Sequence, residues 1–316
     1  MTMSPGFKNF LWMMVGVAIL LGVAVLAMRY YEIPDCAAQI LFRARKVELI
    51  AQARQALLSS SEAEKSAVLA ITDQESQTFA DQSRAASALV EQKSRVLASL
   101  LETGGTTGEK ELLDQFSRAF AKLQRIDDDL LALAVKNTNV KAYALAFGPG
   151  AEALKEMDDG LSRMVEESAG STSPEAKRLM LLASVADSAA LRIQTLLPPH
   201  IAEESNQKMD DLEALMAKDD QKIRRGLADL NTLLKPTESP DLKTAVSAYD
   251  RLSQIRAQIL KLSRENTNVH SLAISLDQKR KAMLACQAAL AALEQAIQEE
   301  PIEGMNCRTP TNPRKL

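Results

Sequence analysis

Two asparagines have the type and spacing that could form a binding site. Asn137 and Asn266 occupy the same place in two copies of a 25-residue stretch, which begin at Leu123 and Leu252, 129 positions apart. In each copy, apolar residues recur alternately three and four positions apart, as in a helix buried along one stripe, and the asparagine lies on that stripe. A buried amide needs a hydrogen-bond partner. The partner is either a small ligand held between helices or a neighbouring helix, in which case the asparagine fixes helix register.

The predicted stripe has eight positions in each copy. In the first copy they are Leu123, Ile126, Leu130, Leu133, Asn137, Val140, Ala144 and Phe147. In the second copy they are Leu252, Ile255, Ile259, Leu262, Asn266, Val269, Ala273 and Leu276. Asn139 and Asn268 fall off the stripe, so we expect them to be less buried than Asn137 and Asn266.

Other residues with chemical potential lack the spacing that a reactive or metal site needs. His200 and His270 have no histidine or cysteine at ligand spacing, so no metal site is expected. Asp127, Asp128 and Asp129 are consecutive, point in different directions on a helix and are expected to form a solvated face. The chain has no phosphate-binding loop, dinucleotide fingerprint, serine elbow or haem-attachment motif, so we expect no enzyme, no catalytic residues and no cofactor.

Composition favours helices and argues against nucleic-acid binding. The 316 residues are rich in alanine, leucine and charged residues, whereas aromatic residues make up only 4%. This balance is typical of long helices rather than sheets. The formal net charge is −3, with acidic and basic residues interspersed, which is not the charge distribution of a nucleic-acid-binding protein.

An uncharged apolar segment, residues 10–28, follows a short N-terminal flank, residues 1–9. As a helix it is about 28 Å long, which suits a transmembrane anchor, and Trp12 and Tyr30 suit the two membrane interfaces. The alternative is a cleaved signal peptide with Lys8 as its basic flank. Nothing else in the chain is expected to span, so we predict a single-pass protein. Flanking basic residues leave the orientation open, because large domains translocate largely regardless of charge.

Glycine- and proline-rich breaks centred near residues 105, 171 and 237 are spaced 66 residues apart. They predict an all-α protein: a long antiparallel up-down-up-down four-helix bundle over residues 34–300, followed by a disordered tail, residues 301–316. Its four helices are predicted at about 34–102, 109–168, 175–234 and 240–300. Gly148–Pro149–Gly150 and Pro198–Pro199 predict a kink at mid-height. The alternative treats these two breaks as true turns and gives two short bundles in tandem.

The predicted bundle brings two of the three cysteines to the same level. Cys36 precedes the first turn by 69 residues, and Cys307 follows the third turn by 70. A Cys36–Cys307 disulfide is possible if the domain is in an oxidising compartment. The alternative is three unpaired thiols, with Cys286 as a small core residue.

The anchor, the helical bundle and the repeated segments LLALAVKNTNVKAYAL and ILKLSRENTNVHSLAISL together carry a resemblance. They resemble the four-helix-bundle sensor domain of methyl-accepting chemotaxis proteins, in a duplicated or elongated form. The resemblance implies a bundle outside the inner (cytoplasmic) membrane that binds a small ligand or a periplasmic partner. Those receptors continue into a second membrane span and a signalling domain, neither of which we expect here.

Two hypotheses follow for the function. The first is a membrane-anchored, chemoreceptor-like sensory protein without its own signalling domain. It would bind a small ligand near Asn137 and Asn266 or near the kink, and act as a homodimer or beside a partner membrane receptor. The second is a structural membrane-tethered scaffold that binds no small molecule. A polar cavity around the asparagines would favour the first hypothesis, and a filled core the second.

Overall fold

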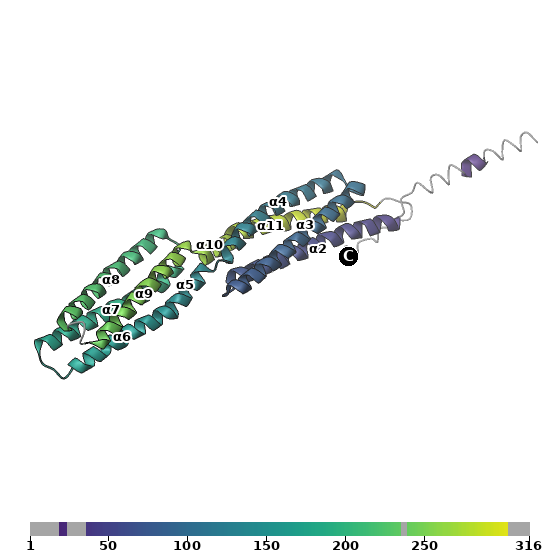
Figure 1. Ribbon diagram of the computed structural model, residues 1–316. Coiled ribbons are helices and arrows are strands. Elements are labelled where there is room, and N and C mark those ends of the chain that lie inside the picture. The colour runs from purple at the N-terminus through teal and green to yellow at the C-terminus, as the bar shows by residue number, and fades with distance from the viewer. Residues whose placement is uncertain (1–18, 24–35, 235–238, 303–316) are drawn as a thin grey trace, which may run out of the picture. The chain divides into compact units, whose positions relative to one another are not determined.

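The computed structural model describes residues 19–23, 36–234 and 239–302, and this part of the chain is helical throughout, without a strand (Figure 1). The prediction of an all-α protein is therefore confirmed. The helices are α2 (Cys36–Leu69), α3 (Asp73–Gly104), α4 (Thr107–Ala134), α5 (Thr138–Phe147), α6 (Pro149–Ser168), α7 (Pro174–Ala202), α8 (Asn206–Leu234), α9 (Pro240–Glu265), α10 (Thr267–Ile274), the π-helical η1 (Ser275–Lys279) and α11 (Arg280–Glu299).

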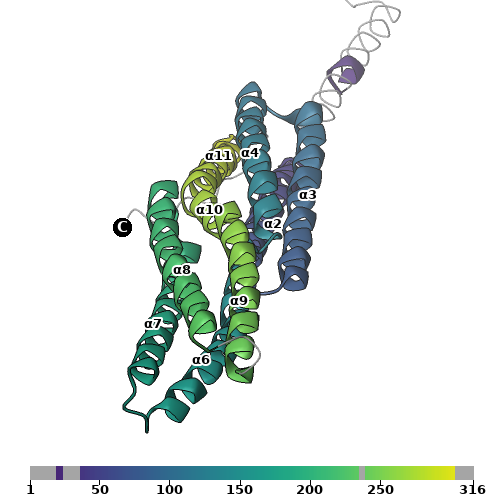
Figure 2. The same cartoon turned by 60° about the vertical axis from the view of Figure 1, so that its left-hand side comes forward.

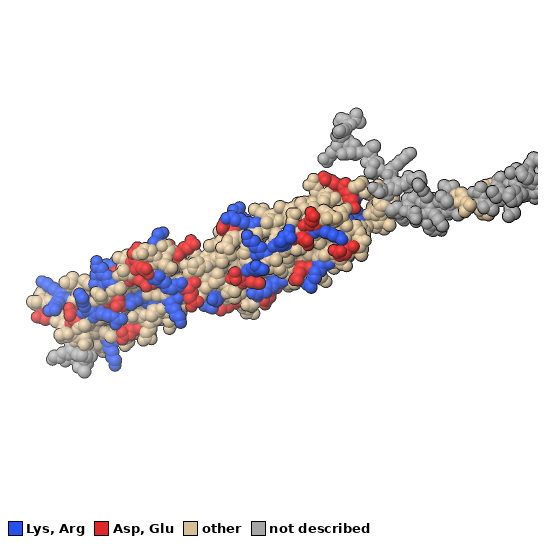
Figure 3. Space-filling view, turned by 90° about the horizontal axis from the view of Figure 1, so that it is seen from above, with Lys and Arg blue, Asp and Glu red and all other residues tan. Residues whose placement is uncertain are grey.

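The chain divides into two compact units. Unit 1 combines the segments up to Ala56, Ala88–Ala119 and from Ala285 onward, and so contains one end each of α2, α3, α4 and α11. Unit 2 combines Leu57–Ser87 with Phe120–Leu284 and contains everything else. On the face shown in Figure 3, acidic and basic side chains are interspersed over the surface, as the sequence predicts.

The predicted continuous helix over residues 34–102 is wrong, because the chain turns back at residues 70–72. In unit 2, the Ser60 hydroxyl donates to the Ser83 carbonyl at 3.1 Å, and the Ser83 hydroxyl donates to the Ser60 carbonyl at 2.9 Å. These bonds join α2 and α3 as an antiparallel pair. The turn has a local cause: Thr72 caps α3 by accepting from the Glu75 amide at 3.2 Å and donating to its carboxylate at 3.0 Å. Thr72 is therefore the N-cap residue of α3.

The predicted helix over residues 175–234 is wrong for the same reason. It is divided at residues 203–205, where the Glu203 carboxylate accepts from the Ser205 amide at 2.9 Å and thereby satisfies a backbone donor at the start of α8. The two halves, α7 and α8, pack antiparallel, as the Arg192–Asp219 ion pair of 3.1 Å shows. Pro198–Pro199 lies inside α7 and does not form the turn.

The core of unit 2 lies between α6, α7, α8 and α9 (Figure 2). Small side chains allow close helix packing there: a Cβ on Gly160 of α6 would lie 2.9 Å from the Asp241 carbonyl of α9. The α7 face in this core is alanine-rich. Its buried members are Leu179, Ala183, Ala186, Ala189, Ala190, Ile193, Leu197 and Ile201.

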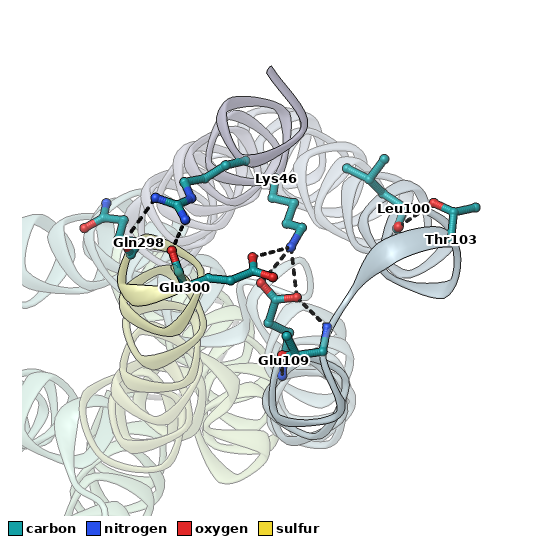
Figure 4. A network of polar contacts seen from close by, with 8 residues as sticks. Lys46, Leu100, Thr103, Glu109, Gln298 and Glu300 are labelled. Atoms are coloured by element: carbon teal, nitrogen blue, oxygen red, sulfur yellow. Dashed lines mark hydrogen bonds and ion pairs between the residues drawn. The ribbon is translucent and has the colours of Figure 1, made fainter. Parts of the chain in front are cut away.

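In unit 1, a buried ion pair joins α2 to the start of α4 (Figure 4). The Lys46 ammonium donates to the Glu109 carboxylate at 2.8 and 2.9 Å, and both side chains are almost fully buried. Glu109 also closes a capping box with Thr106 at the α4 N-terminus. Glu300, at the end of α11, approaches Lys46 at 3.3 Å.

The last helix of each sequence repeat packs with the other repeat. The first repeat comprises α2–α6 and the second α7–α11. In unit 1, α11 of the second repeat contacts α2 through the Arg54–Glu294 ion pair of 2.6 Å. In unit 2, α6 of the first repeat lies along α9 and α7 of the second. The two repeats have therefore exchanged their terminal helices.

Asn137 and Asn266 separate α4 from α5 and α9 from α10. Both have φ of 50°, in the left-handed region that ends a helix. The chain leaves each junction in a new direction, so the predicted stripe is wrong beyond it. Phe147 and Leu276, which the stripe places in the core, are 63% and 62% exposed.

The predicted transmembrane anchor lies mostly outside the described residues; residues 19–23 are helical and exposed. Among the described helices, α7 is also long and apolar enough to cross a membrane by length and composition, which we had not expected. A core helix passes the same test, and Ala186 and Ile193 of α7 lie in the core of unit 2.

We expect Asn266→Ala to lower the free energy of unfolding by about 2–4 kcal/mol. Alanine in the left-handed conformation costs about 1–2 kcal/mol, and the lost buried hydrogen bonds add to this. Asn266→Gly should be less destabilising by about 1–2 kcal/mol, because glycine adopts positive φ readily. Chemical denaturation measures both. Asn231→Ala, on the exposed face of α8, is the control and should change stability little. Equal losses of stability for alanine and glycine would show that the left-handed backbone conformation does not determine the stability of the junction.

Candidate functional site

The two junctions contact each other through equivalent threonines. Thr138 and Thr267 are buried, and their hydroxyl oxygens lie 3.2 Å apart. The Thr138 amide donates to the Thr267 hydroxyl at 3.3 Å, and the Thr267 amide donates to the Thr138 hydroxyl at 3.1 Å. Each threonine hydroxyl thus accepts from a backbone amide at the N-terminus of the other helix, which has no partner within its own helix.

Four asparagines complete this polar layer. The amides of Asn139 and Asn268 each donate to the other residue's side-chain oxygen at 3.1 Å. The Asn139 side chain donates to Asn266 at 2.7 Å, and that of Asn268 donates to Asn137 at 3.0 Å. Asn139 is buried at 5% exposure although it lies off the predicted stripe, whereas Asn268 is half-buried, as expected for a position off the stripe. The junction geometry, rather than the helical stripe, determines the burial of Asn139.

Asn137 and Asn266 are the residues that the sequence analysis proposes for ligand binding. The structure places both in the layer, 1% and 2% exposed, with their side-chain oxygens bonded to the opposite repeat. Neither lines a cavity described below, and their role in ligand binding stays a prediction. The observed bonds are those of the structural alternative, in which the asparagines fix how two helices meet.

A cavity of about 280 Å³ lies elsewhere in unit 2, between α2 and the continuous run of α10, η1 and α11. This volume is close to the lower end of small-molecule pockets, about 300 Å³. Its wall is predominantly apolar. The lining residues are Ser61, Glu64, Lys65, Val68, Leu69, Leu272, Ser275, Leu276, Lys279, Arg280 and Met283.

The π-helical η1 forms one wall of the cavity. Its widened turn directs the Lys279 side chain inward, so that this residue is only 2% exposed. Such π-bulges occur frequently at functional sites. The equivalent place in the first repeat, 129 positions earlier, is Gly148–Pro149–Gly150, where α5 ends and α6 begins. Both repeats therefore depart from regular α-helix here, which agrees with the break predicted at Gly148–Pro149–Gly150.

A buried ion cluster lies behind this wall. The Lys279 ammonium is 2.9 Å from the Glu64 carboxylate of α2 and 2.8 Å from the Asp127 carboxylate of α4. The ammonium and both Glu64 oxygens are inaccessible to solvent and make no hydrogen bond of normal geometry with the described residues. The charges are therefore paired by distance, and the cluster carries one excess negative charge when all three groups are ionised.

Burial raises the pKa of the Asp127 carboxyl, because loss of hydration outweighs the opposing charge of Lys279, and the charge of Glu64 raises it further. Asp127 is only 6% exposed, so its assignment to a solvated face is wrong. Asp128 and Asp129 are exposed, as expected.

The ion cluster was not predicted, although the sequence contains a signal for it. Ala53, Leu57, Ser60, Glu64 and Ala67 are spaced alternately four and three apart, and all are buried. A charged residue on such a stripe predicts a buried ion pair. We know of no comparable sequence signal for the inward turn of Lys279, because the π-helix shifts the periodicity by one residue.

His200, which the sequence analysis excludes as a metal ligand, is fully buried at the end of α7. Its ring nitrogens lie 2.8 Å from the Ser263 hydroxyl and 2.9 Å from the Glu213 carboxylate. Glu213 accepts in turn from Arg264 at 2.7 Å, a bond that lowers the pKa of the Glu213 carboxyl. This chain of contacts joins α7, α8 and α9. No group of three potential metal ligands occurs among the residues that the structure describes.

The cysteines differ in their surroundings. Cys36, at the start of α2, is disulfide-bonded. Cys286 is fully buried in α11, in agreement with its interpretation as a core residue. Cys307 lies outside the described residues, so its pairing with Cys36 stays a prediction.

In comparisons with known proteins, no family model and no curated protein matches this chain. The geometry described above therefore carries the functional argument alone.

We expect the stability of Asp127→Asn relative to the parent protein to increase as the pH rises above 3.8, the ordinary pKa of an aspartate. The raised pKa means that folded Asp127 binds more protons than unfolded Asp127 above its ordinary value of 3.8, so ionisation lowers the stability of the parent protein as pH rises. Asparagine removes this loss. Denaturation curves across the pH range measure the difference. Asp129→Asn, an exposed change in the same helix, is the control, and a pH-independent difference for Asp127→Asn would contradict the argument.

Proposed function

We propose that this chain is a membrane-anchored helical sensory protein, related to chemoreceptor sensor domains, that binds a small molecule in the cavity between α2 and η1. The observation that carries the proposal is the combination of an apolar cavity, a π-helical wall and a buried ion cluster behind it. Regular packing of apolar helices requires none of these three features.

The ion cluster gives binding a route to the helices. Glu64, Asp127 and Lys279 belong to α2, α4 and η1, so a ligand that displaces η1 from α2 changes distances between charges on three helices. Charge interactions away from water depend strongly on distance. A small displacement at the cavity is thus converted into a difference in helix packing, which a sensor needs.

The anchor and the disulfide support a location outside the inner (cytoplasmic) membrane. Residues 10–28 serve as the single membrane span, and the disulfide at Cys36 requires an oxidising compartment such as the periplasm. Anchored in this way, the helical domain signals by contact with a second copy of itself or with a partner membrane receptor.

The alternative function is a membrane-tethered scaffold that binds no small molecule. The asparagine layer favours it, because Asn139, Asn266 and Asn268 direct their side chains to protein partners rather than to a ligand. The cavity beside η1 distinguishes the two functions, since a scaffold has no use for it.

The sensory function predicts a ligand that stabilises the protein and competes with a cavity-filling substitution. We would screen the full chain in lipid nanodiscs by thermal shift against organic acids, amino acids, amines and alcohols. A ligand at a hundred times its dissociation constant adds about 2.7 kcal/mol to stability and raises the melting midpoint by several degrees. Ser61→Phe, which fills the cavity mouth without removing a hydrogen bond among the described residues, should abolish the shift.

Two outcomes would contradict the proposal. One is the absence of a shift across the whole panel, which would leave the scaffold. The other is a shift that Ser61→Phe leaves unchanged, which would place binding elsewhere. Asn137→Leu then tests whether the asparagine layer is the site instead, with the exposed change Asn231→Leu as its control.

The proposed location predicts a Cys36–Cys307 disulfide in the protein isolated from cells. Non-reducing proteolysis and mass spectrometry should recover the two cysteine-containing peptides as one linked species, which reduction separates. Cys307→Ser should abolish this species, whereas Cys286→Ser should leave it intact. Recovery of Cys36 and Cys307 as separate thiol peptides would contradict the oxidising compartment.

A further inference from the structure

The cavity beside η1 also indicates what kind of molecule it binds. Resting on the proposed function, we propose that its ligand is an amphiphilic monoanion: a single carboxylate attached to a hydrocarbon chain of medium length. The argument uses the wall of the cavity, the charges at its mouth and the inaccessibility of the ion cluster.

The wall of the cavity is suited to a hydrocarbon chain. Five apolar side chains contribute to it, from both α2 and the α10–α11 run, namely Val68, Leu69, Leu272, Leu276 and Met283. Val68 and Met283 are buried, whereas Leu69 and Leu276 are 70% and 62% exposed. Covering exposed leucines with a hydrocarbon chain removes apolar area from water, which favours binding.

The mouth of the cavity is suited to an anion. Lys65 and Arg280 line it and are exposed, and neither forms an ion pair with a described residue. Arg280 uses one N–H to donate to the Leu276 carbonyl at 3.2 Å, and its other N–H groups make no bond within the described chain. The neighbouring acid Asp277 is paired with Lys281 at 2.6 Å. Two cations are thus available to one carboxylate.

The only acid that lines the cavity does not oppose this assignment. Both oxygens of Glu64 are inaccessible, and Lys279 neutralises one of them at 2.9 Å. A ligand in the cavity therefore meets the aliphatic part of Glu64 and not its charge. Among the lining residues, no further cation is accessible to a second carboxylate, because the Lys279 ammonium is also inaccessible. One anionic group at the mouth and an apolar chain inside satisfy the whole lining.

The test compares three six-carbon compounds, hexanoate, hexan-1-ol and hexylamine, with succinate as a dicarboxylate. Isothermal titration of the full chain in lipid nanodiscs measures their affinities, and empty nanodiscs correct for partitioning into lipid. We expect hexanoate to bind at least tenfold more tightly than the other three. Arg280→Gln and Lys65→Gln should each weaken hexanoate about fivefold to tenfold, as loss of a charged contact predicts. Lys261→Gln, on the exposed face of α9 and outside the cavity, should have no effect.

A charge reversal provides the decisive variant, because it changes only exposed residues and should leave the unliganded melting midpoint unchanged. Lys65→Glu combined with Arg280→Glu should reverse the preference from hexanoate to hexylamine. The anion assignment is overturned if hexanol or hexylamine binds the parent protein as tightly as hexanoate, or if the reversal leaves the preference unchanged. It is also overturned if hexanoate does not bind. In each case the sensory function still stands if another compound binds and Ser61→Phe abolishes its binding.

Discussion

The pairing of two left-handed asparagine junctions is the constraint on which the arrangement of unit 2 depends. A non-glycine residue with positive φ costs energy by itself, and the helix that follows it begins with unsatisfied amides. Here each junction satisfies the other, through reciprocal bonds between Thr138 and Thr267 and between Asn139 and Asn268. Neither junction has this stabilisation without the other. The directions of α5 and α10, and with them the exposure of Phe147 and Leu276, follow from this pairing.

The asparagine layer and the ion cluster show two different uses of buried polarity. In the layer, nearly every polar atom has a hydrogen-bond partner, and such networks fix one arrangement of helices. In the cluster, Glu64 and Lys279 are close in distance but lack hydrogen bonds of normal geometry. The layer therefore fixes how helices meet through hydrogen bonds, whereas the cluster joins α2, α4 and η1 through charge.

The sequence predicted the helical class, because heptad spacing is a local signal, and it singled out Asn137 and Asn266, which the structure buries at two helix junctions. The prediction failed where a short capping signal interrupts a long stretch of helical periodicity. The N-cap at Thr72 begins α3 after the chain turns at residues 70–72, yet no glycine or proline marks the break. The predicted stripe placed Ile126 in the core, but the buried residue is its neighbour Asp127, the partner of Lys279. The cavity was beyond prediction, because it depends on a π-helix that periodicity does not encode.

The contacts at the junctions also have a symmetry. In a symmetric dimer, a residue on the two-fold axis meets its own copy, and any other contact occurs twice with the roles reversed. Thr138 meets Thr267, its equivalent 129 positions later, and the contact from Asn139 to Asn266 recurs as the contact from Asn268 to Asn137. The two junctions of this single chain are therefore related by an approximate two-fold axis that passes between Thr138 and Thr267, so the contacts on one side of the asparagine layer recur on the other.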